Sequence, residues 1–283
     1  MNPVLHISSD MNRSEVVHIL ESNDLHAKTK FGQNFLCNED IIKRIIEVSG
    51  VGPDSVCLEI GPGIGALTEP LSDLCSSLTA VEIDKELFSY LEKTLGSKVT
   101  LHLSDYLKLK KEDYIVKPYD HVLSNIPYYV MTGIMKKLMV DCGNAEKMTF
   151  MVEDEAIARI ICEPSNKQYG PLAVLVGVYG SARREFTVPS DCFYPMPHTV
   201  SAVITLSRED RGFEITDDFC SFVEAAFSKR RKTLSNSLSA YLSSVDVKMP
   251  FKEALKTMDL EEIIRAEVLK PLDFVELYKL LLL

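Results

Sequence analysis

Asn125, Ile126, Pro127 and Tyr128 have the types and spacing of a receptor for a flat base that carries an amino group. The Asn125 side chain offers an amide oxygen. Pro127 has no N–H and disfavours helical angles at the residue before it, which leaves the Ile126 carbonyl outward-facing as a second acceptor. Tyr128 adds a flat aromatic face. Taken alone, these four residues fit a strand-to-loop turn with a buried tyrosine better, so the rest of the chain has to decide.

A glycine-rich turn stands between a buried-strand pattern and a helical pattern. The apolar run 56–60 leads into the turn 61–65, GPGIG, and a helix through about residue 74 follows. Glycines at such a turn let the backbone come close to a ligand, as in nucleotide-binding α/β folds. The next apolar run, 78–84, carries Glu82 about twenty residues after Gly61, the spacing at which a carboxylate meets both ribose hydroxyls of a cofactor. The pair predicts an adenosine-containing cofactor.

Two further strand patterns end beside polar side chains. The run 99–103 is followed by Asp105, and the run 119–123 is followed by Asn125. Because the carboxyl ends of parallel strands meet at one edge of a sheet, both side chains are expected to lie beside Gly61 and Glu82. Asp105 would then meet the adenine amine of the cofactor, although aspartate at a strand end is also a common turn residue.

The glycine turn alone does not distinguish NAD from S-adenosylmethionine, since the run 61–66 has the G-x-G-x-x-A form. The Asn125–Tyr128 stretch and the lack of a convincing proton-relay His or Lys-Tyr pair disfavour hydride transfer. S-adenosylmethionine fits better, with its adenosine at Glu82 and Asp105, its methionine part across the glycine turn and its methyl group toward Asn125. No metal is expected.

The same residues suggest how an adenine amine becomes reactive. The amine is a poor nucleophile because its lone pair is delocalised into the ring. If Asn125 and the Ile126 carbonyl each accept an N–H bond, the nitrogen moves toward tetrahedral geometry and its lone pair can aim at the methyl group. In-line displacement then depends mainly on positioning.

A loop with two prolines, residues 192–197, lies between strand patterns at 185–188 and 201–206. The prolines stiffen this loop and could hold Phe193 or Tyr194 opposite Tyr128 across a base. For one of these two aromatic residues, packing in the core is the expected alternative. Further patterns predict a strand at 147–152, helices at 14–20, 41–48, 85–95, 131–140 and 154–161, and only helices after about residue 213.

Composition fits an ordinary globular protein of 283 residues, with 46% hydrophobic and 25% charged residues. No apolar run approaches the ~20 residues of a membrane span, and no secretory signal is expected at the start of the chain. The seven cysteines are scattered singly, which predicts neither a zinc site nor disulfides and favours a cytoplasmic location.

The net charge of −10 is unfavourable for binding nucleic acid, which calls for a basic surface. Such a surface would have to be local. The candidate basic clusters are Lys28 with Lys30, Lys108 with Lys110 and Lys111, Arg183 with Arg184, and the run 229–232. For each cluster alone, a solvated face is the simpler interpretation.

Together the motifs resemble those of the small-subunit ribosomal RNA adenine N6,N6-dimethyltransferases, the kasugamycin-resistance type. The resemblance runs from about Lys28 to Leu238. Its motifs are KFGQNFL at 30–36, LEIGPGIGALT at 58–68, AVEID at 80–84, NIPY at 125–128, YGPL at 169–172, FYPMP at 193–197 and RRKTL at 230–234. Several ordered motifs of this kind are highly specific and outweigh the acidic net charge.

The resemblance implies a Rossmann-like class I methyltransferase fold, an α/β fold with a doubly wound, mostly parallel sheet, one antiparallel strand and a small C-terminal α-helical domain. The expected divisions are an N-terminal helical extension at 1–25, a methyltransferase domain at 26–211 and a helical RNA-binding domain at 212–283. The implied partner is small-subunit rRNA within a ribosomal assembly intermediate. The protein would act as a cytoplasmic monomer, away from membranes.

The resemblance also implies the reaction and the site. S-adenosylmethionine would dimethylate N6 of two adjacent adenosines near the 3′ end of 16S-type rRNA and leave as S-adenosylhomocysteine. Cofactor contacts are expected at Asn34, Leu36 (through its backbone), Gly61, Glu82, Asp105 and Asn125. The target adenine would be held by Asn125 and the Ile126 carbonyl, in the turn set by Pro127, and stacked by Tyr128 and Phe193.

Three positions depart from the family pattern. After Tyr128 the family often has Asn-Ile-Ser or Asn-Ile-Thr, whereas this chain has Tyr129-Val130-Met131-Thr132. The family's Gln-Lys-Glu segment is Glu-Asp-Glu at 153–155 here, and His198 stands where a basic residue is common. The last two changes remove positive charge, which bears on RNA binding rather than on the chemistry.

Two alternatives remain open at this stage. One is the related large-subunit rRNA methyltransferases that confer antibiotic resistance. The basic run 229–232, expected on a helix, and the FGQN run at 31–34 favour the small-subunit type. The other is a methyltransferase-fold protein that serves as an assembly or transcription factor, against which the intact Glu82, Asp105 and Asn125 argue.

Overall fold

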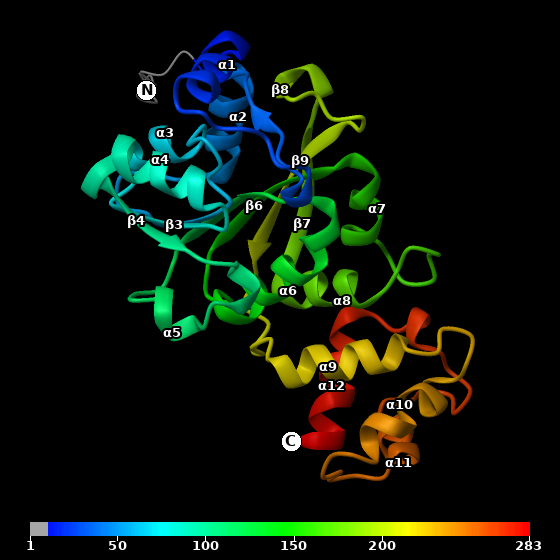
Figure 1. Cartoon of the computed structure of the whole chain (residues 1–283). Coiled ribbons are helices and arrows are strands. Elements are labelled where there is room, and N and C mark those ends of the chain that lie inside the picture. The colour runs from blue at the N-terminus through cyan, green and yellow to red at the C-terminus, as the bar shows by residue number, and fades with distance from the viewer. Residues whose placement is uncertain (1–10) are drawn as a thin grey trace, which may run out of the picture. The chain divides into compact units, whose positions relative to one another are not determined.

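A seven-stranded sheet forms the centre of the fold in the computed structural model, which describes residues 11–283 (Figure 1). The strand order is β4-β3-β2-β5-β6-β9-β7. The strands are β2 (Val56–Ile60), β3 (Ser77–Glu82), β4 (Val99–Leu103), β5 (His121–Asn125), β6 (Lys147–Glu153), β7 (Gly180–Val188) and β9 (Ser201–Arg208). Five neighbouring strands, in the order β4, β3, β2, β5 and β6, pair in parallel. Strand β9 pairs antiparallel to β6, so the predicted sheet architecture is confirmed.

The central strands are near-continuous apolar runs because helices cover a parallel sheet on both faces. Four of the five residues of β2 and four of the five of β5 are buried. The register pairs Ile60 of β2 with Val81 of β3 and with Ser124 of β5. The residues that follow these strand ends therefore come together at one edge of the sheet.

Helices connect the strands, and several begin at side chains that cap them. The helices of the first half are α1 (Arg13–Ser22), α2 (Glu39–Ser49), α3 (Thr68–Leu74), α4 (Lys85–Leu95), α5 (Lys111–Tyr114) and α6 (Met131–Asp141). Asp84 caps α4 by accepting from the Glu86 amide, and Asn38 caps α2 by accepting from the Ile41 amide. Helix α3 packs on β3, and α4 packs on β3 and β4.

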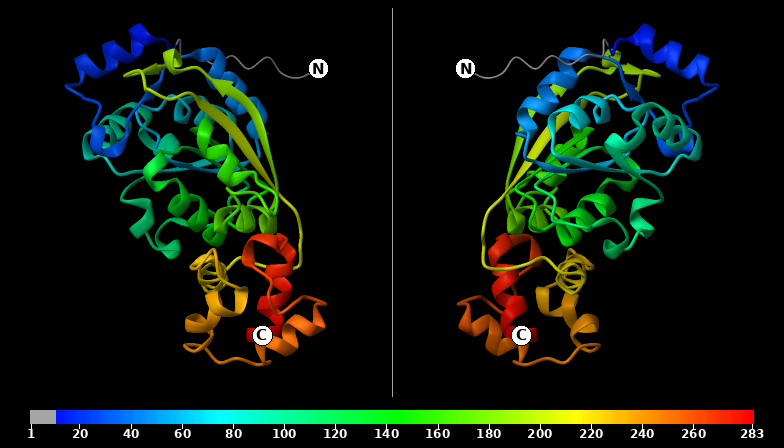
Figure 2. Two further views of the ribbon diagram at one scale, coloured as in Figure 1. Left: turned by 90° about the vertical axis from the view of Figure 1, so that its right-hand side faces the viewer. Right: turned by 90° about the vertical axis from the view of Figure 1, so that its left-hand side faces the viewer.

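A second, two-stranded sheet joins distant parts of the chain. Strand β1 (Phe35–Leu36) pairs antiparallel with β8 (Phe193–Tyr194), with Leu36 opposite Phe193. Helix α1 packs against β8, and the views of Figure 2 place its dark-blue ribbon at the same end as the yellow-green ribbon of β8. The helix predicted at 14–20 is thus present, whereas residues 1–10 of the expected extension lie outside the described residues.

The second half of the chain adds helices α7 (Ile157–Ile160), α8 (Pro171–Tyr179), α9 (Asp217–Phe227), α10 (Leu234–Leu242), α11 (Phe251–Thr257) and α12 (Pro271–Leu282). By their contacts the residues divide into two compact units, one of 1–135, 144–156 and 183–207, the other of 136–143, 157–182 and 208–283. The domain boundaries expected from the sequence stay a prediction.

Some local predictions were wrong in detail. The basic run 229–232 is not helical but forms the turn between α9 and α10, because Thr233 caps a new helix through the Asn236 amide. The predicted helix 154–161 is a 3₁₀ turn, Asp154–Ala156, followed by the short α7. Strand β5 extends to Asn125, so this residue ends the strand instead of following it.

Candidate active site

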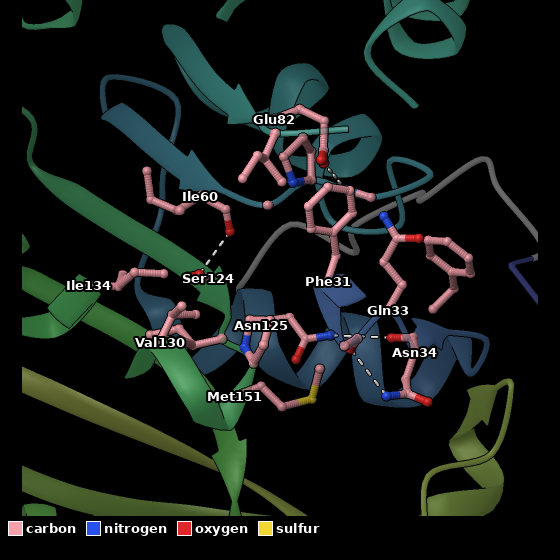
Figure 3. Close-up of a pocket in the computed structure, with 18 of the residues that line it drawn as sticks. Phe31, Gln33, Asn34, Ile60, Glu82, Ser124, Asn125, Val130, Ile134 and Met151 are labelled. Carbon is pink, nitrogen blue, oxygen red and sulfur yellow. Dashed lines mark hydrogen bonds between the residues drawn. The ribbon is translucent and has the colours of Figure 1, made fainter. Parts of the chain in front are cut away.

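A cavity of about 400 Å³ opens at the carboxyl edge of the sheet (Figure 3). It brings together all ten residues expected to contact the cofactor or the base, whereas Tyr194, the alternative to Phe193, is not among the residues that line it. The lining includes Asn34, Leu36, Gly61, Glu82, Asp105, Asn125, Ile126, Pro127, Tyr128 and Phe193. These residues come from the ends of four parallel strands and from the β1–β8 pair, so the fold, and not sequence proximity, assembles the site.

The glycine turn leaves open space where a ligand can approach the backbone. Gly61 has φ 72°, and a Cβ placed on it would meet no heavy atom within 4 Å. Gly63 has φ 63° and its amide donates to Glu82 Oε2 at 3.1 Å. Any side chain at Gly61 would enter the cavity, so this turn fits a cofactor that crosses it.

Glu82 is a buried carboxyl at the end of β3. Its oxygens accept from the Gly63 amide and, at 2.7 Å, from the Asp84 amide. Burial raises the pKa of Glu82 to about 7, although both backbone hydrogen bonds oppose the rise. A ligand that donates hydroxyl hydrogens to this carboxylate would stabilise its charged form, as a ribose does.

Asp105 caps the 3₁₀ turn Tyr106–Lys108 and accepts from the Leu107 amide at 3.1 Å. It lies beyond Glu82 along the same edge, because β4 is the outer neighbour of β3. The order Asp105, Glu82, Gly61 thus runs along three adjoining strand ends. This order fits the adenine, ribose and methionine parts of S-adenosylmethionine.

Asn125 is oriented by the loop that precedes β1. Its Nδ2 donates to the Asn34 carbonyl at 3.4 Å. Figure 3 marks this bond with a dashed line between the two labelled residues. The neighbouring backbone is fixed as well, since the Ile126 amide donates to the Met151 carbonyl at 3.0 Å. An amide side chain accepts only through its oxygen, so Oδ1 is the Asn125 atom that can accept from a bound amine.

The two aromatic residues predicted to stack on a base differ in exposure. The Tyr128 side chain is 48% exposed at the start of a 3₁₀ turn, Tyr128–Val130. Phe193 lines the cavity but is only 1% exposed, because β8 holds it against β1 in the core. A base can reach the Tyr128 ring directly, whereas contact with the Phe193 face requires neighbouring side chains to move.

Asp84 connects the loop before β1 to the Glu82 side of the cavity. Lys28 Nζ lies 2.7 Å from Asp84 Oδ1, and Gln33 Nε2 donates to Asp84 Oδ2 at 3.0 Å. These bonds and the Lys28 ammonium lower the pKa of Asp84 against the opposing effect of burial. The sequence analysis assigned Asp84 and Gln33 no role, although both stand within the quoted motifs.

Glu59 is a second buried carboxyl on the cavity wall, and the sequence analysis did not single it out. It is 2% exposed, and its Oε2 atom has no hydrogen-bond partner among residues 11–283. Burial, with a further contribution from the charge of Glu82, raises the pKa of Glu59 to about 8. The available signal was a carboxylate inside the apolar strand run 56–60.

A family model described as ribosomal RNA adenine dimethylase matches residues 24–278. The chain belongs to this family. Relatives that align with this chain over most of their length are named ribosomal RNA small subunit methyltransferase A. The protein of Shouchella clausii is 35% identical over 92% of this chain and 91% of its own length, and that of Fusobacterium nucleatum is 38% identical over 89% and 97%.

Solved structures agree with this dimethylase membership at the level of the fold. A dimethyladenosine transferase from Plasmodium falciparum superposes with a TM-score of 0.71 at 22% identity, over 87% of this chain and 96% of that one. The 23S rRNA methyltransferase ErmE gives a TM-score of 0.60 at 24% identity, over 88% and 99%. The sheet is therefore that of a class I methyltransferase, as the resemblance implied.

Two features are absent from residues 11–283. No group of three or more His, Cys, Asp or Glu side chains is arranged to hold a metal ion. No helix of this part of the chain has the length and apolar character needed to cross a membrane.

The two raised carboxyl pKa values predict an unusual pH dependence of stability. A native pKa of about 8 at Glu59, above the ordinary 4.5, means that the folded protein holds this proton more tightly than the unfolded chain. The contribution of protonated Glu59 to the free energy of unfolding is fully present below pH 4.5 and is lost as the pH rises toward 8. For a pKa shift of this size it is on the order of several kcal/mol. Glu59→Gln should lose less stability over this range.

Urea unfolding at pH 5.5 and pH 8.5 measures this difference. The wild-type free energy of unfolding should fall more between the two pH values than that of Glu59→Gln. Glu47→Gln, an exposed carboxyl on α2, is the control and should behave as the wild type. Equal losses in wild type and Glu59→Gln would contradict the assignment.

Proposed function

We propose that this dimethylase-family protein transfers methyl groups from S-adenosylmethionine to N6 of adenosines in small-subunit rRNA. The finer proposal is that two adjacent adenosines near the 3′ end each receive two methyl groups. The observation that carries it is the single cavity in which Glu82, at one strand end, and Asn125, two strands away, face the same space. The curated relatives named above support the choice of small-subunit RNA.

The residues present fit the cofactor. Glu82 offers a carboxylate for the ribose hydroxyls, Asp105 lies at the next strand end, and Gly61 leaves the space that the methionine part needs. Asn34 and Leu36 bring backbone groups to the same wall. When bound, S-adenosylmethionine supplies an electrophilic methyl group, so the protein needs no activating metal of its own.

The residues of the chain position the adenine and change the geometry of its N6 amine. In the first transfer Asn125 Oδ1 and the Ile126 carbonyl accept hydrogen bonds from the two N6–H groups, and in the second transfer one of them accepts from the single N6–H that remains. These bonds localise the nitrogen lone pair and stabilise the positive charge that develops on N6, and the N6 proton then leaves to water. Pro127 supports this by adding no competing N–H beside the Ile126 carbonyl. Tyr128 gives the flipped base a face to stack on, offsetting part of the cost of extrusion.

Methylation of under-methylated small subunits with labelled S-adenosylmethionine tests the proposal. Mass spectrometry of the digested RNA should show N6,N6-dimethyladenosine in the small-subunit RNA. Label that enters only large-subunit RNA would overturn the choice of substrate. Cofactor binding without transfer to any RNA would support an assembly factor instead. Parallel reactions with naked RNA and with subunits at successive assembly stages test whether the substrate is an assembly intermediate.

The basic turn 229–232, in the unit that contains residues 208–283, is the proposed contact with RNA phosphates. All four of its side chains are exposed. Arg230 is held by Glu267 at 3.2 Å and by the Asn166 carbonyl, and Arg231 and Lys232 are the next two residues of the same turn. In the cluster at 183–184, by contrast, both arginines are paired with acids, Arg183 with Glu185 and Arg184 with Asp154.

Arg231→Ala should therefore weaken RNA binding in a salt-dependent way. Loss of one phosphate contact lowers the slope of log K against log salt by about 1, with no change in sequence preference. The measurement is RNA affinity at several salt concentrations. Lys256→Ala, an exposed charge on α11, is the control. An unchanged slope in Arg231→Ala would exclude this turn as a contact.

A further inference from the structure

The loop before β1 lies directly against the Asn125–Tyr129 segment. Gly32 has φ 61°, and a Cβ placed on it would come within 3.2 Å of Pro127 Cβ and 3.5 Å of Tyr129 Cε1. A glycine is needed here both for the left-handed backbone and for the close approach. Residues 31–36 of this loop form one wall of the cavity.

Besides the bond from Asn125 to the Asn34 carbonyl, the Tyr129 side chain ties the two segments together. The Tyr129 hydroxyl donates to the Lys30 carbonyl at 3.0 Å, across about a hundred residues of sequence. The side chain is otherwise 62% exposed, so the ring contributes little to the core. Partial desolvation and the negative charge of Asp105 raise the pKa of Tyr129, so the hydroxyl keeps its proton at neutral pH and remains a donor.

The same loop is anchored at its other side by Asp84, through Lys28 and Gln33. Asp84 in turn donates its amide to Glu82 Oε1 at 2.7 Å, which links this anchor to the proposed ribose site. Between the two anchors the Asn34 carbonyl accepts from Asn125. The loop is thus held at the Glu82 side by an ion pair and at the Asn125 side by the Tyr129 hydroxyl.

We propose that Tyr129 is a positioning residue for cofactor binding, which acts by fixing the loop 28–34 as a wall of the cavity. The proposal rests on the proposed function, since the ligand is the cofactor assigned there. Tyr129 also lines the cavity, but the proposed effect is carried by its bond to the loop backbone. Its hydroxyl limits how far the loop can open, and the binding surface is then ordered before the cofactor arrives.

Tyr129→Phe removes the hydroxyl and keeps the ring. One hydrogen bond of ordinary strength corresponds to about a fivefold effect. We expect amide hydrogen exchange at residues 29–34 of the cofactor-free protein to accelerate about fivefold, and the Kd of S-adenosylhomocysteine to rise about three- to tenfold. The kcat at saturating cofactor should stay within about twofold of wild type, because Asn34 still orients Asn125.

Tyr241→Phe is the matched control, since the Tyr241 hydroxyl also donates to a distant backbone carbonyl, that of Asp218 at 3.4 Å. It should change neither the exchange at 29–34 nor the Kd. Gly32→Ala disturbs the same contact from the loop side and should weaken binding more than Tyr129→Phe. Because Gly32 and Tyr129 lie far apart in sequence, agreement of the two variants would trace the effect to their contact.

Wild-type exchange and wild-type Kd in Tyr129→Phe would overturn the proposal. A lower kcat with unchanged Kd would overturn it too, because Tyr129 would then act on the transfer and not on binding. Failure of the proposed function is distinguishable, since it is scored by the absence of methyl transfer from the wild-type protein to small-subunit RNA, whereas the proposal for Tyr129 is scored by amide exchange and by the Kd. Exchange at 29–34 is measured without ligand and would still report on the Tyr129 contact in that case.

Discussion

Replacing Asn125 by alanine is expected to lower methyl transfer about 10²-fold or more, while cofactor binding weakens by much less. In the proposed mechanism Asn125 Oδ1 accepts a hydrogen bond from the amine whose nitrogen gains positive charge in the transition state, so loss of this oxygen should act mainly on turnover. The variant also loses the bond from Nδ2 to the Asn34 carbonyl. That bond orients the site, and its loss accounts for a modest change in cofactor affinity.

Single-turnover rates with saturating S-adenosylmethionine, together with calorimetric Kd values, separate the two effects. Asn144→Ala is the control, because Asn144 is exposed just before β6, at the opposite edge of the sheet. Asn125→Asp adds a sharper comparison, since it keeps an acceptor oxygen but cannot donate to Asn34. Unchanged single-turnover rates in Asn125→Ala would remove this residue from the chemistry.

The residues that meet at the carboxyl edge of the sheet could be predicted because each strand end can be recognised from the sequence around it. Glu82 ends a buried apolar run and Asn125 closes another, and parallel strands necessarily bring such ends together. No tertiary information is needed for that inference. The roles of the ten lining residues nevertheless rest on chemistry and resemblance, and substitutions at Asn125 and Glu82 test two of them.

The features that could not be predicted depend on tertiary contacts or on ambiguous patterns. The apolar run that begins at Leu172 forms helix α8, which its short length and lack of periodicity could not establish. Pro171 at its start and Gly180 at its end were the available signals. The burial of Phe193 depends on a strand of two residues, too short for any pattern, and Tyr129 meets Lys30 only in the folded chain.

Glu82→Ala is expected to weaken cofactor binding about ten- to hundredfold, the range for losing hydrogen bonds to a charged acceptor. Turnover at saturating cofactor should fall less, since Asn125 and Tyr128 are untouched. Calorimetry with S-adenosylhomocysteine measures the loss. Glu92→Ala, an exposed carboxyl on the following helix α4, is the control and should bind as the wild type.

The pKa of about 7 gives this assignment a second, independent test. Ribose hydroxyls that donate to Glu82 favour its charged form, so binding lowers its pKa and releases a proton. Wild-type affinity should therefore rise between pH 6 and pH 7 and level off above, by at most tenfold per pH unit. Glu82→Ala should lose this rise, while Glu59→Gln should keep it. A pH dependence that survives in Glu82→Ala would mean that another group binds the ribose or releases the proton.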